Sequence, residues 1–243
     1  MPARTLSEAD SKILLAGFGV AFAPEHVVKT ADQAVAAAVE VGLPVVAKLN
    51  GDAIAHKTER GLVRLNLADE DAVRTAAQSL LDAATPADGE VGVLVAPMLQ
   101  GNRELIAGLA DDPQFGMTVM VGIGGILAEA IADVAVRPVP ISEIDAAEMI
   151  DELRTQALLG EFRGEPAVDR AALAQVPLGL SAAAQADRTI RSADLNPLIV
   201  VDGKPIAVDG KEGAEVEELG QGHGVRLDDG GGPDFGPAKV PEG

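Results

Sequence analysis

Two apolar segments joined by a short polar turn stand near the end of the sequence: Asp194-Leu195-Asn196-Pro197-Leu198-Ile199-Val200 and Ala207-Val208-Asp209-Gly210. The connection contains Asp202-Gly203, which predicts a β-hairpin because both residue types tolerate a positive φ. The hairpin would bring the amide of Asn196 near the carboxylate of Asp209. Oxygen ligands on neighbouring strands suit Mg²⁺, whose shell is completed by water and nucleotide phosphates. The segment therefore indicates either a metal-nucleotide site or an ordinary edge hairpin.

The amino-acid composition limits the kinds of partner. The 243 residues suffice for one large domain or two small ones, and 47% of them are hydrophobic while only 2% are aromatic. The formal charge of −19 argues against nucleic acids and anionic membranes, whose binding needs clustered Lys and Arg, but it leaves a nucleotide ligand open. The absence of cysteine excludes disulfides, thiolate metal sites and cysteine nucleophiles.

The start of the sequence and its apolar runs predict a soluble cytoplasmic protein. Met1 to Thr5 lead into a polar helix start rather than into the apolar core of a signal peptide. No uninterrupted apolar run approaches the roughly 20 residues that span a membrane. We therefore expect neither a membrane nor a nucleic acid among the partners.

Hydrophobic periodicity and turn residues predict alternating helices and strands. Helices are expected at residues 7–17, 30–41, 69–84, 144–159 and 170–184, with another after the glycine turn at 122–125. Strands are expected at residues 20–23, 44–49, 63–67, 92–98, 103–109, 117–121 and 135–138, followed by the hairpin. His26 is assigned to a connection. The alternation predicts an α/β or α+β fold, with mixed sheets because hairpins pair antiparallel strands.

Two neighbouring segments carry cations suited to a phosphate. Lys48 stands in the apolar strand Pro44-Val45-Val46-Ala47-Lys48-Leu49, where a buried ammonium needs an acid or a phosphate as its partner. The alternative is a lysine whose stem packs in the strand while its ammonium reaches solvent, which is the commoner arrangement for a lone lysine. The following loop contains Ala55-His56-Lys57-Thr58-Glu59-Arg60-Gly61, whose donors can cover nucleotide phosphates. His56 is then either a catalytic group or a solvated loop residue.

A glycine turn and an acid further along the sequence could belong to the same site. Gly122-Ile123-Gly124-Gly125 follows an apolar strand, and such a turn can present N–H groups to an anion at a helix start. It lacks the full phosphate-loop and dinucleotide patterns, so a tight structural turn explains it as well. Glu104 is an exposed acid by default, but with Asn196 and Asp209 it could complete an oxygen-rich site for Mg²⁺ and ATP.

These motifs together resemble one family, the ATP-grasp subunit or domain of the NDP-forming acyl-CoA synthetases, also called ADP-forming acetate–CoA ligases. The sequence is more distantly similar to the β subunit of succinyl-CoA synthetase. The resemblance runs over about residues 6–213. It rests on segments in the family's order: Leu43-Pro44-Val45-Val46-Ala47-Lys48, His56-Lys57-Thr58-Glu59, Arg103-Glu104-Leu105-Ile106-Ala107-Gly108, Asp112-Pro113-Gln114-Phe115-Gly116, Val121-Gly122-Ile123-Gly124-Gly125-Ile126, Leu158-Leu159-Gly160 with Arg163-Gly164, and the Asn196-Pro197-Leu198 hairpin.

The resemblance implies a role for each matching residue. Lys48 matches the lysine that contacts nucleotide phosphate, and Ala96 to Met98 match the hinge strand whose backbone faces adenine. Asn196 and Asp209 match the Mg²⁺ ligands, and His56 matches the histidine that receives a phosphoryl group. The other residues assigned to the nucleotide are Lys57, Glu104, Gly124 and Gly125.

The resemblance also implies an ATP-grasp fold, in which two subdomains clamp ATP. We expect an N-terminal helix region at residues 1–23, a first subdomain acting as a lid at 24–94, and a second subdomain with the metal hairpin at 95–213. Residues 214–243 are rich in Gly, Pro and acids, which predicts a flexible tail. The sequence departs from the family at Glu59-Arg60-Gly61-Leu62-Val63, where Asp-Val-Gly-Gly-Val is usual.

The implied function is the nucleotide half of the reaction acyl-CoA + ADP + phosphate ⇌ carboxylate + CoA + ATP. A phosphoryl group would pass through His56 to ADP, with Mg²⁺ and ADP or ATP bound. The CoA-binding and ligase parts would lie on an α subunit, in a hetero-oligomer. Two alternatives stay open: an ATP-grasp ligase of other specificity without a phosphohistidine, and a non-catalytic nucleotide-sensing subunit.

Overall fold

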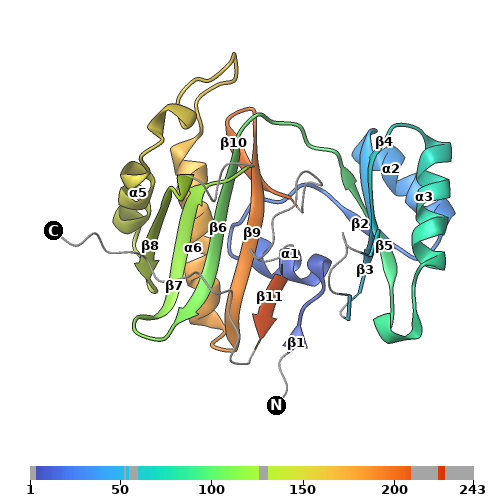
Figure 1. The fold of residues 1–243 in the computed structure, drawn as a ribbon, viewed down its shortest axis with the longest axis horizontal. Helices are drawn as coiled ribbons and strands as arrows, with labels where there is room; N and C mark the ends of the chain where they lie inside the picture. Colours follow the sequence, from blue (N-terminus) through green and yellow to red (C-terminus); the bar gives the residue numbers. More distant parts are fainter. Residues whose placement is uncertain (1–3, 52, 55–59, 126–130, 209–223, 228–243) are drawn as a thin grey trace.

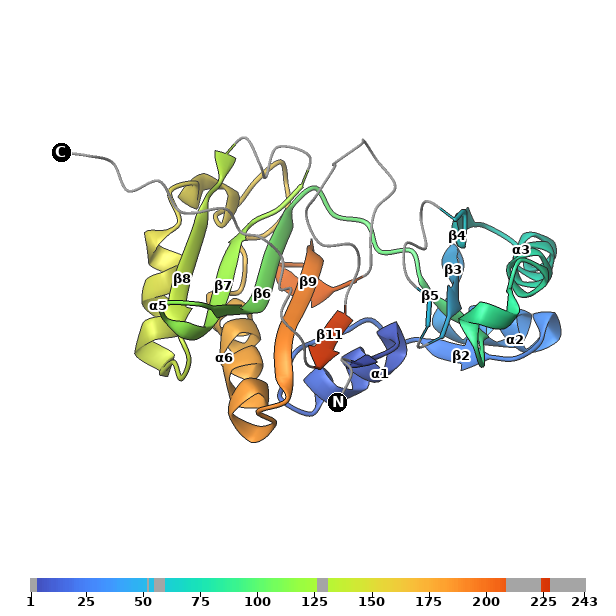
Figure 2. The same cartoon turned by 60° about the horizontal axis from the view of Figure 1, so that its bottom comes forward.

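The computed structural model of the protein describes residues 4–51, 53–54, 60–125, 131–208 and 224–227. Over these residues the chain forms a four-stranded sheet and a seven-stranded sheet. The two sheets lie toward opposite ends of the molecule, with the N-terminal helix between them (Figures 1 and 2). None of the described helices is long and apolar enough to cross a membrane.

The four-stranded sheet is built from residues 26–97. In spatial order its antiparallel strands are β2 (His26–Val28), β5 (Gly92–Pro97), β3 (Val45–Asn50) and β4 (Val63–Leu67). The helices α2 (Ala31–Val41) and α3 (Glu70–Asp82) cover the face turned away from the other sheet (Figure 1). Thr30 and Asp69 begin these helices by accepting hydrogen bonds from the backbone N–H groups of Gln33 and Ala72, as N-caps do.

The seven-stranded sheet has its central strand near the end of the chain. Its strands are β1 (Arg4–Thr5), β11 (Gly224–Leu227), β9 (Ile190–Val201), β6 (Glu104–Asp112), β7 (Gly116–Ile123) and β8 (Val134–Pro138) in spatial order, with β10 (Lys204–Ala207) paired to β9. The helices α5 (Glu143–Glu152) and α6 (Arg170–Ala186) pack on one face and enclose the larger apolar core.

The N-terminal helix α1 (Glu8–Ala16) contacts both sheets. Its Leu15 is buried in the core of the seven-stranded sheet. Its Ala9 packs against Val46 and Ala96 on the face of the four-stranded sheet that α2 and α3 leave uncovered. Helix α1 therefore brings its first turn next to the inner face of β3.

The predicted hairpin is confirmed in the described residues. Val201 pairs with Lys204, and the two residues between them have positive φ, 49° at Asp202 and 80° at Gly203. The register continues to Ala207 opposite Leu198. The Asp-Gly turn therefore has the conformation that its sequence predicts.

Two predictions for the first half of the chain were wrong. His26 begins strand β2, although the sequence placed it in a connection. Residues 20–23, predicted as a strand, form only an isolated bridge between Phe22 and Ala207. The apolar run at 20–23 instead packs on the larger core, where Val20 is 3% exposed.

The helix predicted at residues 144–159 is shorter in the structure. Helix α5 ends at Glu152, because Leu153 leaves the helical conformation with ψ 127°. The Gln156 amide donates to the carbonyls of Ile150, Asp151 and Leu153, which satisfies the helix end, and a separate turn follows as η2 (Gln156–Leu158).

The predicted division of the chain also needs correction at two places. Residues 224–227 form β11, which pairs with β1 and β9, although the sequence assigned them to a flexible tail. The boundary expected after residue 94 falls inside β5, which belongs to the four-stranded sheet through Pro97. Short strands of Gly, Val, Arg and Leu carry little periodicity, so β11 could not be separated from its Gly-rich surroundings.

Candidate functional site

A cleft lies where the inner face of the four-stranded sheet, helix α1 and the β9–β10 hairpin meet. Its lining includes Lys12, Lys48, Ala96, Met98, Pro197 and Ile199. Lys48, Ala96 and Met98, which the sequence assigned to a nucleotide, thus lie around the same cleft as Pro197, the neighbour of Asn196. The remaining residues of the lining are mostly apolar, as ligand sites usually are.

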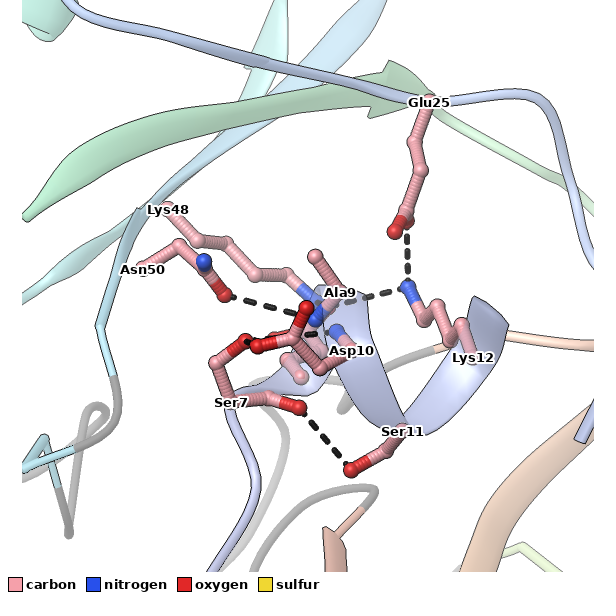
Figure 3. Close-up of polar contacts among 9 residues, drawn as sticks. Ser7, Ala9, Asp10, Ser11, Lys12, Glu25, Lys48 and Asn50 are labelled. Carbon is pink, nitrogen blue, oxygen red and sulfur yellow. Dashed lines mark hydrogen bonds and ion pairs between the residues drawn. The ribbon is translucent and has the colours of Figure 1, made fainter. Parts of the chain in front are cut away.

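The side chain of Lys48 is buried and paired with an acid. It is 4% exposed, and its Nζ lies 3.5 Å from Oε1 of Glu8, whose side chain is 1% exposed. The same Glu8 oxygen lies 2.9 Å from Nζ of Lys12, which also lies 2.6 Å from Oε2 of Glu25 (Figure 3). The prediction of an acidic partner for Lys48 is confirmed, and the alternative of an ammonium reaching solvent is wrong.

Sequence reasoning missed Glu8, Lys12 and Glu25 as members of the site. Glu8 falls within the helix expected at residues 7–17, and the sequence assigned it no role in the site. The signal available was the spacing of Glu8 and Lys12, which places an acid and a base on one helix face. That spacing alone also describes most solvated helix faces, and only the packing of α1 against β3 distinguishes the two cases.

The segment Ala96 to Met98 forms the wall of the cleft next to Lys48. Ala96 is paired with Val46 in the sheet, and the backbone N–H of Met98 donates to the carbonyl of Pro44 at 2.9 Å. That N–H is therefore already used. A base entering the cleft would meet the side chain and the remaining backbone atoms of this segment.

Glu104, Gly124 and Gly125 form a second group, where β6 begins and β7 ends in the larger sheet. Glu104 begins β6 opposite Ile199, a residue of the cleft. The N–H of Gly124 donates to the carbonyl of Glu104 at 2.8 Å, and a Cβ at Gly124 would come within 3.1 Å of the Glu104 and Leu105 carbonyl carbons. Gly125, at φ 89°, lies beside the Glu104 carboxylate, since a Cβ there would be 3.9 Å from Oε2. This close approach explains why glycine is needed at the turn. The helix expected after the turn would begin in residues 126–130, which lie outside the described residues.

The structure describes the β9–β10 hairpin as far as Val208, one residue before Asp209, the predicted carboxylate ligand. The backbone N–H of Val208 donates to the carbonyl of Pro197 at 3.1 Å, so the hairpin continues toward Asn196. Asp209 lies outside the described residues, as do His56 and Lys57. Within the described ranges no group of three or more His, Asp or Glu side chains is placed to hold a metal ion. The Mg²⁺ ligand set therefore stays a prediction.

Arg60 and Leu62 fix the end of the loop that follows β3. The Arg60 guanidinium donates to both carboxylate oxygens of Asp88, at 2.7 and 2.9 Å, so its charge is already paired. Leu62 is 1% exposed in the core of the four-stranded sheet, and its carbonyl accepts from Leu49. The departure from the family's glycine thus adds a buried side chain to that core.

We expect Asp88→Asn to make the protein less sensitive to acid. The Arg60 guanidinium, helped by the N–H and hydroxyl of Thr85, holds the pKa of Asp88 well below its usual range. A carboxylate with a lowered folded-state pKa stabilises the protein above its unfolded pKa of about 3.9, and this stability is lost as the pH falls. Thermal unfolding midpoints measured from about pH 7 to about pH 3 should fall more steeply in the wild type than in Asp88→Asn. The exposed Asp71→Asn serves as the control, and equal slopes in all three proteins would contradict the assignment.

Comparison with known proteins adds to this geometry. Residues 2–211 match the ATP-grasp domain family. The beta subunit of the ADP-forming acetate–CoA ligase I of Pyrococcus furiosus is 35% identical over 211 residues, which cover 86% of this chain and 91% of the relative.

Two solved structures are similar over nearly the whole chain. One is the dinucleotide forming acetyl-coenzyme A synthetase 1 of Ca. Korarchaeum cryptofilum with coenzyme A, Ca-AMPCP and HgCl+, with a TM-score of 0.77, 30% identity, and coverage of 93% of this chain and 94% of that one. The other is the same enzyme with coenzyme A and Mg-AMPPCP, its phosphohistidine segment pointing towards the nucleotide binding site. It has a TM-score of 0.72, 31% identity, and coverage of 91% and 92%.

Proposed function

This chain belongs to the ATP-grasp family, and from that premise we propose that it is the nucleotide-binding, phosphoryl-transferring subunit of an ADP-forming acyl-CoA synthetase. The family resemblance and the expected ATP-grasp fold are thereby confirmed. The subunit would catalyse the nucleotide half of acyl-CoA + ADP + phosphate ⇌ carboxylate + CoA + ATP. One observation carries the proposal: the cleft joins Lys48 of one sheet to the hinge segment at Ala96 and to the β9 hairpin of the other sheet.

The nucleotide would lie between the two sheets. Lys48 would contact its phosphates, with Lys57 from the loop that follows, and Ala96 and Met98 would contact its base. Gly124 and Gly125 would line the phosphate end beside Glu104. An ammonium that is 4% exposed is suited to this task, because electrostatic attraction is stronger where water is excluded.

The oxygen donors at the phosphate end suit Mg²⁺. Asn196 would supply an amide oxygen and Asp209 a carboxylate, while Glu104 lies at the same end of the β6–β9 pair. A hard cation with an all-oxygen shell fits this donor set, and the chain has no cysteine to favour a softer metal. Mg²⁺, when bound, would neutralise phosphate charge, and the side chains named here would hold it.

His56 would be the phosphoryl carrier. A neutral imidazole is a competent nucleophile near pH 7. In the direction of ATP use, the new bond joins an imidazole nitrogen to the γ-phosphorus, the bond from that phosphorus to the β–γ bridging oxygen breaks, and ADP leaves. The reverse transfer would make ATP. In the Korarchaeum enzyme with Mg-AMPPCP, a phosphohistidine segment points towards the nucleotide binding site, and this likeness supports the proposal.

A partner subunit would supply the remaining chemistry. The Pyrococcus furiosus relative is named a beta subunit, which supports a hetero-oligomer here, with CoA binding and acyl-phosphate formation on an α subunit.

The purified chain should bind Mg-ATP and Mg-ADP without turning over acyl-CoA. Isothermal titration measures the binding, and a coupled assay with CoA, acetate and ATP measures turnover. Lys48→Met should weaken nucleotide binding at least about tenfold, because a charged hydrogen-bond donor is lost from a buried site. Lys29→Met is the matched control, since Lys29 is 54% exposed and pairs with Glu90.

Two results would contradict this proposal. Robust CoA- and acetate-dependent ADP formation by the chain alone would show that no partner is needed. Nucleotide binding without any acid-labile phosphate on the protein, even with its partner present, would favour an ATP-grasp ligase that works without a phosphohistidine.

A further inference from the structure

Helix α1 places two buried charged side chains beside Lys48, one of them in the lining of the cleft, and the nucleotide roles proposed above use neither. Lys12 lines the cleft with Lys48, and Glu8 lies between their ammonium groups. The side chains of Glu8, Lys12 and Lys48 are 1%, 9% and 4% exposed. Figure 3 shows Lys12 and Lys48 on either side of the first turn of α1, with Glu25 beyond Lys12.

The contacts within this group are unequal. Glu8 Oε1 lies 2.9 Å from Lys12 Nζ but 3.5 Å from Lys48 Nζ, so Lys12 makes the closer contact with the shared carboxylate. Glu25 also approaches Lys12, at 2.6 Å. Among these four described residues, two ammonium groups face two carboxylates. Of these two ammonium groups, Lys12 is therefore the closer one to Glu8 and the one that contacts Glu25.

Because the group is buried, the way in which the two carboxylates are shared between the two ammonium groups has a large effect on their energies. Burial raises the pKa of Glu25, against the opposing effect of Lys12, which indicates a poorly solvated environment. In such an environment an unpaired carboxylate is costly and attracts the nearest cation. If Lys12 were neutral, Glu8 and Glu25 would both have Lys48 as the nearest buried cation of the group. A nucleotide phosphate would then compete with two carboxylates for one ammonium.

We propose that Lys12 is a positioning residue of the nucleotide site: by binding Glu8 and Glu25 it keeps the Lys48 ammonium available to nucleotide phosphate. This role rests on the proposed function, since it presumes that Lys48 contacts a nucleotide. Lys12 acts through the two carboxylates and does not itself contact the phosphate. Helix α1 therefore controls the electrostatic environment of a nucleotide site whose other residues lie on the two sheets.

A pair of variants tests this role by rescue. Lys12→Gln should weaken Mg-ATP binding about tenfold, as expected when one positive charge is removed from beside Lys48 in a buried group. The double variant Glu8→Gln, Lys12→Gln removes one carboxylate together with one ammonium and should bind within about threefold of the wild type. Glu8→Gln alone should bind at least as tightly as the wild type. Affinities are measured by isothermal titration on the full chain.

Affinity and stability together separate this role from two others. Because Glu8→Gln removes the buried carboxylate that lost Lys12, it could also repair a folding defect, so urea unfolding of each variant is measured beside its affinity. Weak binding by a Lys12→Gln protein that is folded under the titration conditions supports the positioning role, and a weakness that only follows unfolding of the variant overturns it. If Lys12 contacted phosphate directly, the double variant would stay as weak as Lys12→Gln, and the proposal would be overturned. Weaker binding by Glu8→Gln alone would overturn it too, because Glu8 would then be needed to orient Lys48.

The same titrations distinguish this proposal from the function on which it rests. A wild-type chain that binds no Mg-ATP overturns the proposed function and this role with it. A wild-type chain that binds Mg-ATP, loses affinity in Lys48→Met and keeps it in Lys12→Gln overturns the positioning role alone.

Discussion

His56→Ala is expected to abolish the transfer of phosphate from γ-labelled ATP to the protein while leaving nucleotide affinity within a few fold of the wild type. The imidazole is the only group we assign to the covalent step, so its loss removes the acceptor. Affinity is retained because Lys48 and the segment at Ala96 lie in the cleft independently of that side chain. The measurement combines autoradiography of the acid-labile phosphate with isothermal titration of Mg-ATP.

His26 provides the matched control. It lies in β2 of the four-stranded sheet, its side chain is 38% exposed, and its Nε2 lies 3.5 Å from Oε2 of Glu40 on α2. His26→Ala should leave the labelling unchanged. Labelling that persists in His56→Ala would show that another residue carries the phosphate.

Arg103→Met is expected to lower the free energy of unfolding by about 3 kcal/mol, which is the largest effect on stability that we foresee. Arg103 is buried, and its guanidinium donates to the carbonyls of Leu158, Gly160 and Pro166 at 3.3, 2.9 and 2.6 Å. It also contacts the Glu165 carboxylate at 3.1 Å. Methionine keeps much of the packing but leaves these acceptors without their donor.

Urea unfolding at neutral pH measures this change. Arg137→Met is the control, since Arg137 pairs with Glu152 across the surface and such pairs contribute under about 1 kcal/mol. A loss as small as that of the control would mean that water replaces the guanidinium. The contact joins two of the segments on which the family resemblance rests, at Arg103 and at Leu158-Leu159-Gly160.

Local signals predicted much of the fold. Ser7, Thr30 and Asp69 were recognisable helix starts because each caps a backbone N–H within its own turn. The turn at Asp202-Gly203 was recognisable for the same reason: its conformation depends on two residues only. The conformation of each of these features depends on only a few neighbouring residues, so local sequence patterns predict it well.

Features decided by distant packing could not be predicted. The sequence predicted that Lys48 would meet an acid or a phosphate, but it could not say which residue. Glu8 lies forty residues earlier in the chain, and no local pattern connects the two. The strand β11 forms because β9 and β1 offer it an edge on each side, which its own sequence does not show. The end of α5 likewise depends on the side chain of Gln156, beyond the helix.

The position of β9 imposes an order of assembly during synthesis. The four-stranded sheet consists of residues 26–97 and is complete once β5 has left the ribosome. The seven-stranded sheet has β9 between β6 and β11, so β6 keeps an open edge until residues 190–201 emerge. Contacts between segments so far apart close slowly, because the intervening chain must be ordered first. On the ribosome, the sheet that bears Lys48 therefore has its full set of strands long before the sheet that bears Asn196.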